Sequence, residues 1–354
     1  MDTFILDTAY KAVAVLDTFQ SRIWTDRYNR YGDFEVYIPA IMPVCSFLQE
    51  GYYLYSPDLS DRMMIIEDIQ LKCDPEDGDF YTVTGRSLES ILARRVIWGY
   101  REIKGNLQEG IKALLNENVI NPTKTTRKIP NFEFRDSTDS RIASLTLDAQ
   151  YFGDYLYEVI AAICDEKSLG FRVLPNFTNG GLIFELFKGV ERALDQTANP
   201  YVIFSPDFDN FISSNYLETT SNYKNVALVG ADGEGSARKY IDAFEGTDEP
   251  SGLSRRETFT DAYGVSKDEE TTEEDYNKQL KQKGLEELAD LKVTKAFEGE
   301  IDSSRQYVYG RDFGIGDVVQ VTNNYGQSGK SRVSEIVMSE DDTGFIITPT
   351  FTAE

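Results

Sequence analysis

"RMMIIEDIQLKCDPEDGDFYTVTG", residues 62–85, carries the clearest folding signal in the chain. Two stretches rich in apolar, β-branched and aromatic residues flank "DPEDG", residues 74–78, whose residue types are those that turns require. The pattern predicts an antiparallel hairpin. A hairpin at this position indicates that the first part of the chain is built from strands.

The same strand pattern extends toward the N-terminus and returns after residue 200. "FILDTAYKAVAVLD", residues 4–17, and "DFEVYIP", residues 33–39, alternate along one face, as a half-buried strand does. The later segments with strand character are "YVIFSPD", "FISSNYLETT", "KNVALVG", "VTKAFEGEI", "DVVQVTNN", "KSRVSEIVMSE" and "GFIITPTF". Two strand-rich regions therefore lie at the two ends of the sequence.

Between these regions the period of the apolar residues changes to that of helices. A short helix is expected over 88–95, a second begins after Asn106 as its capping residue, and a third occupies "FGDYLYEVIAAICDEKSLG", residues 152–170. A hairpin follows, in which Asn179 and Gly180 supply the positive φ angles of a tight turn. These features predict a middle α+β domain.

Residues 241–290 interrupt the second strand-rich region with 15 acidic and 6 basic residues. They include an expected helix, "TTEEDYNKQLKQKGLEELADL", interrupted at Gly284. The fold class is therefore α+β and mainly β. Two small β-barrel domains, residues 1–90 and 196–354, are expected to bracket the middle domain, residues 91–195, with an acidic helical insertion at about 241–291 in the second barrel.

The composition excludes several classes of partner. The formal net charge of −24 repels phosphate backbones and anionic lipids, so we expect no stable nucleic-acid binding. No run of about 20 apolar residues is present, so no membrane insertion is expected. The N-terminus has no secretion signal, and three cysteines without C-x-x-C spacing (Cys45, Cys73 and Cys164) are expected to be buried thiols in a protein made in a reducing cytoplasm.

"NVALVGADGEGSARKY", residues 225–240, resembles a phosphate-binding loop because glycines follow an apolar run and precede Arg238 and Lys239. However, the spacing is G-x-x-G-x-G, and Asp232 and Glu234 would place carboxylates where phosphate should bind. A turn that needs glycine explains the pattern better. A nucleotide-binding enzyme remains an alternative that thermal stabilisation by ATP or NAD would reveal.

No catalytic constellation can be recognised in the sequence. Histidine is absent, which removes the Ser-His and Cys-His nucleophile arrangements. The acidic stretches 74–79 and 268–275 lack the spacing of a calcium loop, and turn formation or helix capping explains them. We therefore expect no enzyme, no cofactor and no metal site. A cell-wall hydrolase acting through two carboxylates remains the strongest enzymatic alternative.

The segment "WTDRYNRYGDFEVYIP", residues 24–39, combines aromatic residues with arginine. This combination is enriched in desolvated protein–protein contacts, and it predicts a subunit interface. The alternative is that the aromatic side chains fill a β-core, and both descriptions can hold in part. The candidate interface residues are Trp24, Arg27, Tyr28, Tyr31 and Phe34.

Several phrases, in this order, resemble the tail-hub or baseplate-hub proteins (Gp37-like) of phages and phage-tail-like particles of Gram-positive bacteria. They are "WTDRYNRYGDFEVYIP", "MIIEDI", "VTGRSLESILARRVI", "VALVGADGEGSAR", "SGLSRRETFTDA" and "YVYGRDFGIGDVVQV". The resemblance implies a structural homotrimer with two tube-like β-barrels per chain, whose six near-equivalent positions adapt a sixfold tail tube to a threefold tip and line the central channel. It places the glycine stretch 225–240 and "RRETFTDA" in the second barrel.

The same resemblance implies the partners and the place of assembly. A tail tube or distal tail protein would lie above the ring, and a tip, spike or other baseplate protein below it. The protein would be made in the bacterial host cytoplasm and assembled into a virion tail or a phage-tail-like particle. The chain stops at Glu354 without a hydrolase extension, so any cutting activity is expected on another protein, and a tail-tip peptidoglycan hydrolase is the alternative function.

Overall fold

A computed structural model describes residues 2–58, 60–76, 78–213, 215–233, 238–267, 271–301 and 306–354. Its largest feature is a 13-stranded sheet in which most strands follow the order β14-β18-β21-β20-β3-β4-β7-β6-β5-β1-β2, while β19 pairs with β20 and β13 with β19. The strands from the first part of the chain are β1 (Thr3–Leu6), β2 (Ala12–Leu16), β3 (Ser21–Arg27), β4 (Asp33–Pro39), β5 (Tyr53–Tyr55), β6 (Met63–Asp74) and β7 (Gly78–Ser87). The strands from the later part are β13 (Ile203–Phe204), β14 (Asn215–Thr219), β18 (Thr294–Glu298), β19 (Val318–Thr322), β20 (Ser328–Asp341) and β21 (Gly344–Ala353).

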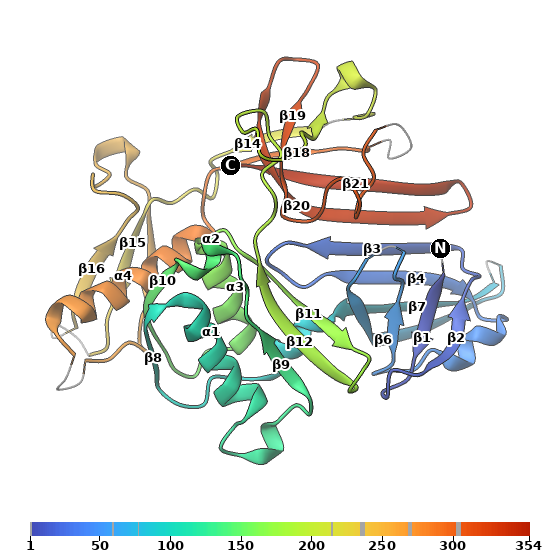
Figure 1. The fold of residues 1–354 in the computed structure, drawn as a ribbon, viewed down its shortest axis with the longest axis horizontal. Helices are drawn as coiled ribbons and strands as arrows, with labels where there is room; N and C mark the ends of the chain where they lie inside the picture. Colours follow the sequence, from blue (N-terminus) through green and yellow to red (C-terminus); the bar gives the residue numbers. More distant parts are fainter. Residues whose placement is uncertain are drawn as a thin grey trace.

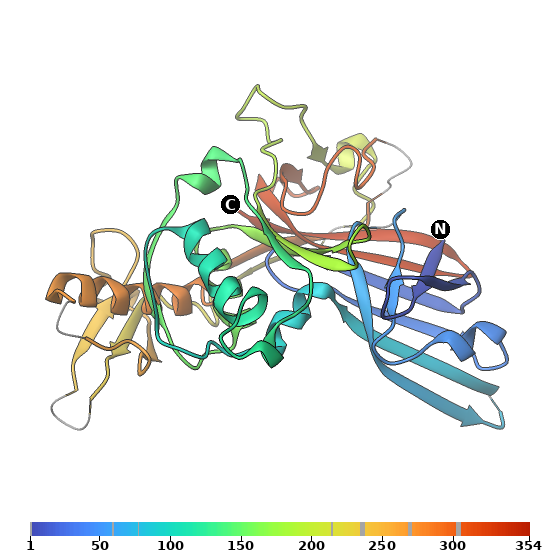
Figure 2. The ribbon, with the colours of Figure 1, turned by 60° about the horizontal axis from the view of Figure 1, so that its bottom comes forward.

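The hairpin predicted at residues 62–85 is confirmed as β6 and β7. The two strands pair antiparallel down to Asp74 opposite Gly78, and the Asp74 side chain accepts the backbone N–H of Glu76 at 2.9 Å. Gly78 has φ +91°, a conformation that glycine adopts at little cost. The hairpin extends beyond its neighbouring strands (Figure 2), so its turn lies well away from the rest of the sheet.

The two strand-rich ends of the chain form one sheet rather than two closed barrels. Strand β3 pairs with β4 along one edge and with β20 along the other, in a register that runs from Arg27 opposite Glu335 to Ser21 opposite Asp341. Figure 1 shows β3, drawn in blue, next to β20, drawn in red. Because β20 occupies the second edge of β3, the first strand group does not close on itself there, and the described residues contain no closed barrel. The expectation of two β-barrels is therefore corrected.

A middle unit of helices and two small sheets packs against this sheet. Its elements are η2 (Leu88–Arg94), β8 (Arg101–Asn106), α1 (Leu107–Leu115), η3 (Asn116–Ile120), η4 (Thr125–Arg127), β9 (Phe132–Arg135), α2 (Ser140–Ala143), β10 (Thr146–Tyr151), α3 (Leu156–Glu166), β11 (Gly170–Asn176) and β12 (Gly181–Phe187). The predicted cap is confirmed, since Asn106 Oδ1 accepts the N–H of Glu109 at 3.1 Å. The turn between β11 and β12 is confirmed as well, with Gly180 at φ +64°. The short helix expected over 88–95 is a 3-10 helix.

The glycine stretch belongs to a separate three-stranded sheet and not to the large sheet, contrary to the expectation. In this sheet β15 (Val226–Gly230) pairs antiparallel with β16 (Tyr240–Ala243) and parallel with β17 (Glu257–Asp261). Helix α4 (Glu273–Ala289) contacts this sheet and also β10 and α3 of the middle unit (Figure 1). We call β15, β16, β17 and α4 the appended unit. The domain boundaries at 90/91 and 195/196 stay a prediction.

Helix α4 and the cysteines differ from what the sequence predicted. Helix α4 continues through Gly284 instead of breaking there. Of the three cysteines, only Cys164 is buried, whereas Cys45 is half-buried and Cys73 is exposed on β6, so the expectation of three buried thiols is wrong. None of the described helices combines the length and the apolar composition that crossing a bilayer requires. The remaining short helices are η1 (Pro43–Phe47), η5 (Pro206–Phe208) and η7 (Gly252–Ser254).

Candidate functional site

Strands β3 and β4 place three of the five candidate interface residues inside the chain. Trp24 and Phe34 are 0% and 2% exposed, and their ring centroids lie 6.4 Å apart in the core of the large sheet. Tyr28 is 3% exposed and donates a hydrogen bond to the backbone oxygen of Ser168 at 3.1 Å. All three side chains fill the interior, and Tyr28 binds the β3–β4 loop to the middle unit.

Arg27 pairs with other strands of the large sheet, whereas Tyr31 contacts the middle unit. The Arg27 guanidinium pairs with Glu335 of β20 at 2.6 Å and also with Asp33. The ring of Tyr31 lies 4.9 Å from that of Tyr157 in α3. All five candidates therefore make contacts within the chain, and a contact with another subunit at this segment stays a prediction.

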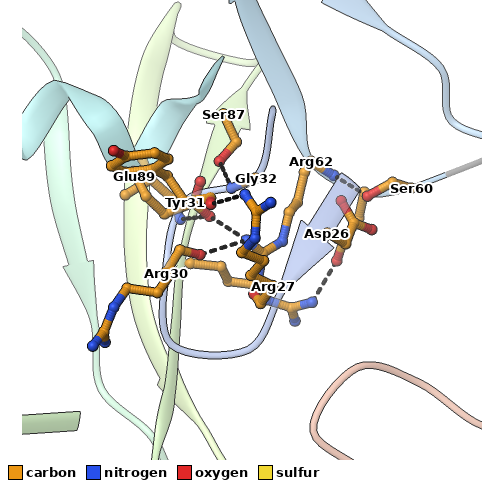
Figure 3. A network of polar contacts seen from close by, with 12 residues as sticks. Asp26, Arg27, Arg30, Tyr31, Gly32, Ser60, Arg62, Ser87 and Glu89 are labelled. Atoms are coloured by element: carbon orange, nitrogen blue, oxygen red, sulfur yellow. Dashed lines mark hydrogen bonds and ion pairs between the residues drawn. The ribbon is translucent and has the colours of Figure 1, made fainter. Parts of the chain in front are cut away.

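Sequence patterns did not reveal the buried polar network that surrounds Arg62 (Figure 3). Arg62 is 1% exposed, donates to the backbone oxygen of Arg27 at 2.6 Å, and lies 3.4 Å from the carboxylate of Glu89 in η2. Glu89 is fully buried and accepts the N–H of Val173 in β11 at 3.1 Å. Through Glu89, one buried guanidinium thus connects the end of β3 with η2 and β11 of the middle unit.

Asp26 adds a second buried carboxyl group to this network. The hydroxyl of Tyr309 donates to it at 3.0 Å, and burial, opposed by the attraction of Arg62, raises the pKa of Asp26. Oδ1 of Asp26 and Oε2 of Glu89 accept no hydrogen bond from any described residue. Because the group is closed off from solvent and joins three parts of the chain, we interpret it as a rigid joint.

Gly32 allows the β3–β4 loop to approach this joint closely. Its N–H donates to Oγ of Ser87 at 2.7 Å, and a Cβ at this position would lie 2.0 Å from the backbone oxygen of Thr25. Only glycine fits such an approach without moving the backbone. The loop therefore owes its path to Gly32 and its anchoring to Arg62.

The side of the large sheet that faces away from its core is exposed and largely polar, and we call it the polar face. Strand register defines one row that crosses six strands, with paired residues in contact from β6 to β21. The row consists of Asp68, Thr84, Glu35, Ile23, Ser339 and Ile346, all exposed or half-exposed. Their neighbours along each strand, such as Trp24, Phe34 and Val83, point into the core. The face therefore continues across the β3–β20 contact without a break.

The charges of the polar face are predominantly acidic. Arg27 is engaged by two carboxylates, and Arg86 pairs with Glu67 at 2.6 Å. Glu35 and Asp68 lie in the exposed row, and neither forms an ion pair with a described residue. A polyanion near this face meets carboxylates and arginines that are already paired.

The glycine stretch has no geometry suited to phosphate in its described part. Arg238 donates to the backbone oxygens of Ala231 at 2.7 Å and Gly230 at 2.9 Å and pairs with Asp261. Its guanidinium thus stabilises the end of β15. Glu234 and Gly235 lie outside the described residues. Among the residues that the structure describes, no group of three or more acidic or cysteine side chains is arranged to hold a metal ion.

Comparison with known families identifies the family of this chain. Residues 2–351 match the family model described as Siphovirus ReqiPepy6 Gp37-like protein. The chain belongs to this Gp37-like family. No curated protein matches this Gp37-like chain significantly.

Solved structures show that this Gp37-like chain has the fold of phage tail proteins. A tail protein from Neisseria meningitidis MC58 is similar with a TM-score of 0.57 and 12% identity, over 100% of this chain and 96% of that one. The 43 kDa tail protein of prophage MuSo2 from Shewanella oneidensis gives 0.55 and 14%, over 100% and 98%. The prophage tail protein gp18 from Listeria monocytogenes EGD-e gives 0.53 and 14%, over 99% and 94%. At such low identities the similarity concerns the fold.

Proposed function

We propose that the protein is a structural, non-enzymatic hub of a phage tail or baseplate, with three copies forming a ring around a central channel. The observation that carries this proposal is the continuous polar face, which crosses from the first strand group to the last at the β3–β20 contact. Membership of the Gp37-like family and the fold shared with phage tail proteins support it. We further propose that the polar face lines the channel.

The sheet order supports the adaptation of a sixfold tube to a threefold tip. On one side of the β3–β20 contact the sheet runs through β3, β4, β7 and β6 and continues through β5, β1 and β2, and on the other side lie β20, β21, β18 and β14. The four strands nearest the contact on each side give each chain two four-stranded arrays side by side. Three copies would present six arrays, which matches the number of positions in a hexameric ring.

The open sheet also changes how subunits could meet. A closed barrel has no free edge, so two closed barrels per chain would leave only side chains and loops for contacts between subunits. In the described chain β2 and β14 end the main strand order and β13 ends the branch through β19, each with one strand neighbour. Edge strands expose unpaired N–H and C=O groups, so strand pairing between copies is available to close the ring.

An acidic channel wall suits the passage of a polyanion. DNA binds proteins mainly by replacing its counterions with lysine and arginine. Arg27 and Arg86 on the polar face already have carboxylate partners. The wall therefore offers few free cations that could replace the counterions of DNA. We propose a tail tube or distal tail protein as the partner above the ring and a tip or spike protein below it, assembled in the host cytoplasm.

Electron microscopy of the particle that contains this chain tests the proposal. We expect three copies in one ring, with β3, β4, β20 and β21 around the channel and their polar face turned inward. Six copies per ring, or one copy on the axis, would contradict the ring. A peptidoglycan zymogram of the purified chain, with lysozyme as positive control, tests the non-enzymatic assignment and is expected to show no cleared band.

A further inference from the structure

Helix α4 is attached to the middle unit mainly through polar contacts. The apolar core of the appended unit, which includes Val229, Leu280 and Leu288, forms a cluster of its own, separate from the core of the middle unit. Across the contact Gln279 hydrogen-bonds with Gln150 and Glu102, and Tyr151 donates to Glu286. An attachment of this kind depends on hydrogen bonds and charges, so it is sensitive to the protonation of its members.

Two carboxyl groups meet at the end of this contact. Asp165, near the end of α3, and Asp290, the residue that follows α4, both lie within ion-pair distance of one guanidinium, and Asp165 Oδ1 also accepts the side-chain N–H of Asn29 at 2.7 Å. Arg30 from the β3–β4 loop lies between them, 2.8 Å from Asp290 and 3.7 Å from Asp165. Two carboxyl groups beside one cation can hydrogen-bond to each other only when one of them carries a proton.

We propose that Asp165, Asp290 and Arg30 form a proton-dependent clasp that holds the appended unit on the middle unit more tightly at acidic than at neutral pH. With one proton shared, the pair carries one negative charge, which the guanidinium balances. When the proton leaves, two carboxylates face a single cation and repel each other. The loss of the proton therefore weakens the attachment of α4.

The surroundings of the clasp add to the negative charge. A cavity of about 440 Å³ lies beside it, between α3, α4 and the segment before α3. The titratable and charged groups that face this region are Arg30 from the β3–β4 loop, Tyr151, Asp154, Tyr155, Tyr157, Glu158, Cys164, Asp165, Glu166 and Lys167 from the middle unit, and Lys283, Glu286, Glu287 and Asp290 from α4 and its end. Carboxyl groups outnumber the cations, so a proton bound here relieves repulsion.

The direction of the pH effect follows from the same groups. Burial, followed by the hydrogen bond with Asp290, raises the pKa of Asp165 to about 6, and burial also raises the pKa of Glu286. The attached state thus binds more protons than the detached state. Its extra stability is fully present below the pKa of a free carboxyl group, near 4, and disappears as the pH rises through about 6.

Hydrogen–deuterium exchange of the full chain at pH 5.0 and pH 7.5 tests the clasp. After correction for intrinsic exchange rates, protection of the amides in α4 is expected to fall at pH 7.5 by up to about tenfold, the limit that is reached when detachment returns the Asp165 pKa from about 6 to that of a free carboxyl group. Amides of β3 and β20, which lie outside this contact, serve as the internal reference. Equal protection of α4 at the two pH values would overturn the proposal.

Matched variants separate the clasp from a general effect of pH. Asp290→Asn removes the like charge and lets an amide donate to Asp165, so the pH effect on α4 is expected to fall below about threefold. Asp165→Asn should act in the same way. Glu274→Gln, on the same helix with a side chain that is 79% exposed, should keep the wild-type response. A full tenfold response in either Asn variant would exclude the clasp, whatever becomes of the proposed tail function.

Discussion

At the scale of single residues, the joint around Arg62 depends on charge balance in a dry environment. Replacing Arg62 with Met would leave Asp26 and Glu89 buried without their cation. We expect Arg62→Met to lower the free energy of unfolding by about 3–5 kcal/mol, because removal of one partner leaves an uncompensated buried charge. Urea denaturation followed by circular dichroism measures this change.

Two companion variants make this prediction specific. Lys278→Met removes an exposed cation that pairs with Glu274 at 2.8 Å, and should change stability by no more than about 0.5 kcal/mol. Adding Asp26→Asn and Glu89→Gln to Arg62→Met should recover part of the loss, since no buried charge then remains. If Arg62→Met is as mild as Lys278→Met, the joint is not a stabilising feature.

The sequence could identify the buried faces of the strands but not what covers them. Alternation along residues 24–39 places Trp24 and Phe34 on one face, yet a core and a subunit interface favour the same residue types. The Arg62 joint was missed for a different reason. Its members come from segments far apart, as with Glu89 and Val173, 84 residues apart, and a lone arginine or glutamate carries no periodic signal.

At the scale of elements, helix α4 contains a glycine whose role is packing. A Cβ on Gly284 would lie 2.4 Å from Cβ of Ala243 and 2.7 Å from Cγ2 of Val229. Alanine would improve helix propensity by about 1 kcal/mol, whereas overpacking costs about 1–3 kcal/mol. We therefore expect Gly284→Ala to destabilise the protein by up to about 2 kcal/mol in urea denaturation. Gly314→Ala, at a site with no atom within 4 Å, is the control, and a stabilised Gly284→Ala would contradict the packing.

The acidic segment 241–275 gives the second prediction at this scale. Its charge density and the lack of a continuous apolar stripe give it little local burial to offset chain entropy, and Leu253 is fully exposed. Limited trypsin digestion of the isolated chain should cut first at a basic residue in this range, such as Arg255, Arg256 or Lys267. N-terminal sequencing of the fragments identifies the site. First cleavage within residues 60–90 would show that the β6–β7 hairpin is the weaker element.

Elements defined by local signals were predictable, whereas pairings between distant segments were not. The turns at residues 74–78 and at Gly180 were found because turn residues act on their own neighbourhood. The pairing of β15 with β17 was not found, because a parallel pair requires a long connection and leaves no short-range signal. The continuity of α4 through Gly284 also depends on tertiary packing, which overrides propensity.

At the scale of the whole molecule, the charge of the polar face decides its behaviour toward DNA. We expect the wild-type chain to show no measurable binding to double-stranded DNA at 100 mM salt, roughly physiological ionic strength. Glu35→Lys combined with Asp68→Lys places two cations on one exposed row and should produce salt-dependent binding in a fluorescence anisotropy titration. Glu109→Lys combined with Glu274→Lys makes the same net charge change away from this face. Equal binding by the two pairs would show that net charge alone matters.

The arrangement of the two strand groups could not be read from the sequence. Each group has the alternation of a half-buried sheet, and such a pattern fits a closed barrel as well as an open sheet. The difference lies in one contact, β3 with β20, between residues near opposite ends of the chain. Family resemblance identified the class of protein, whereas the shared sheet is evident only in the three-dimensional structure.

That contact has a consequence for biosynthesis. Arg27 and Glu335 are 308 residues apart, so at about 5–20 residues per second β3 waits roughly 15–60 s on the ribosome before its partner strand emerges. During this time its edge is open to pairing with other nascent chains on the same polysome. An N-terminal fragment that ends before β20 should therefore aggregate, and a separately supplied peptide spanning β20 and β21 should keep it in solution by occupying that edge.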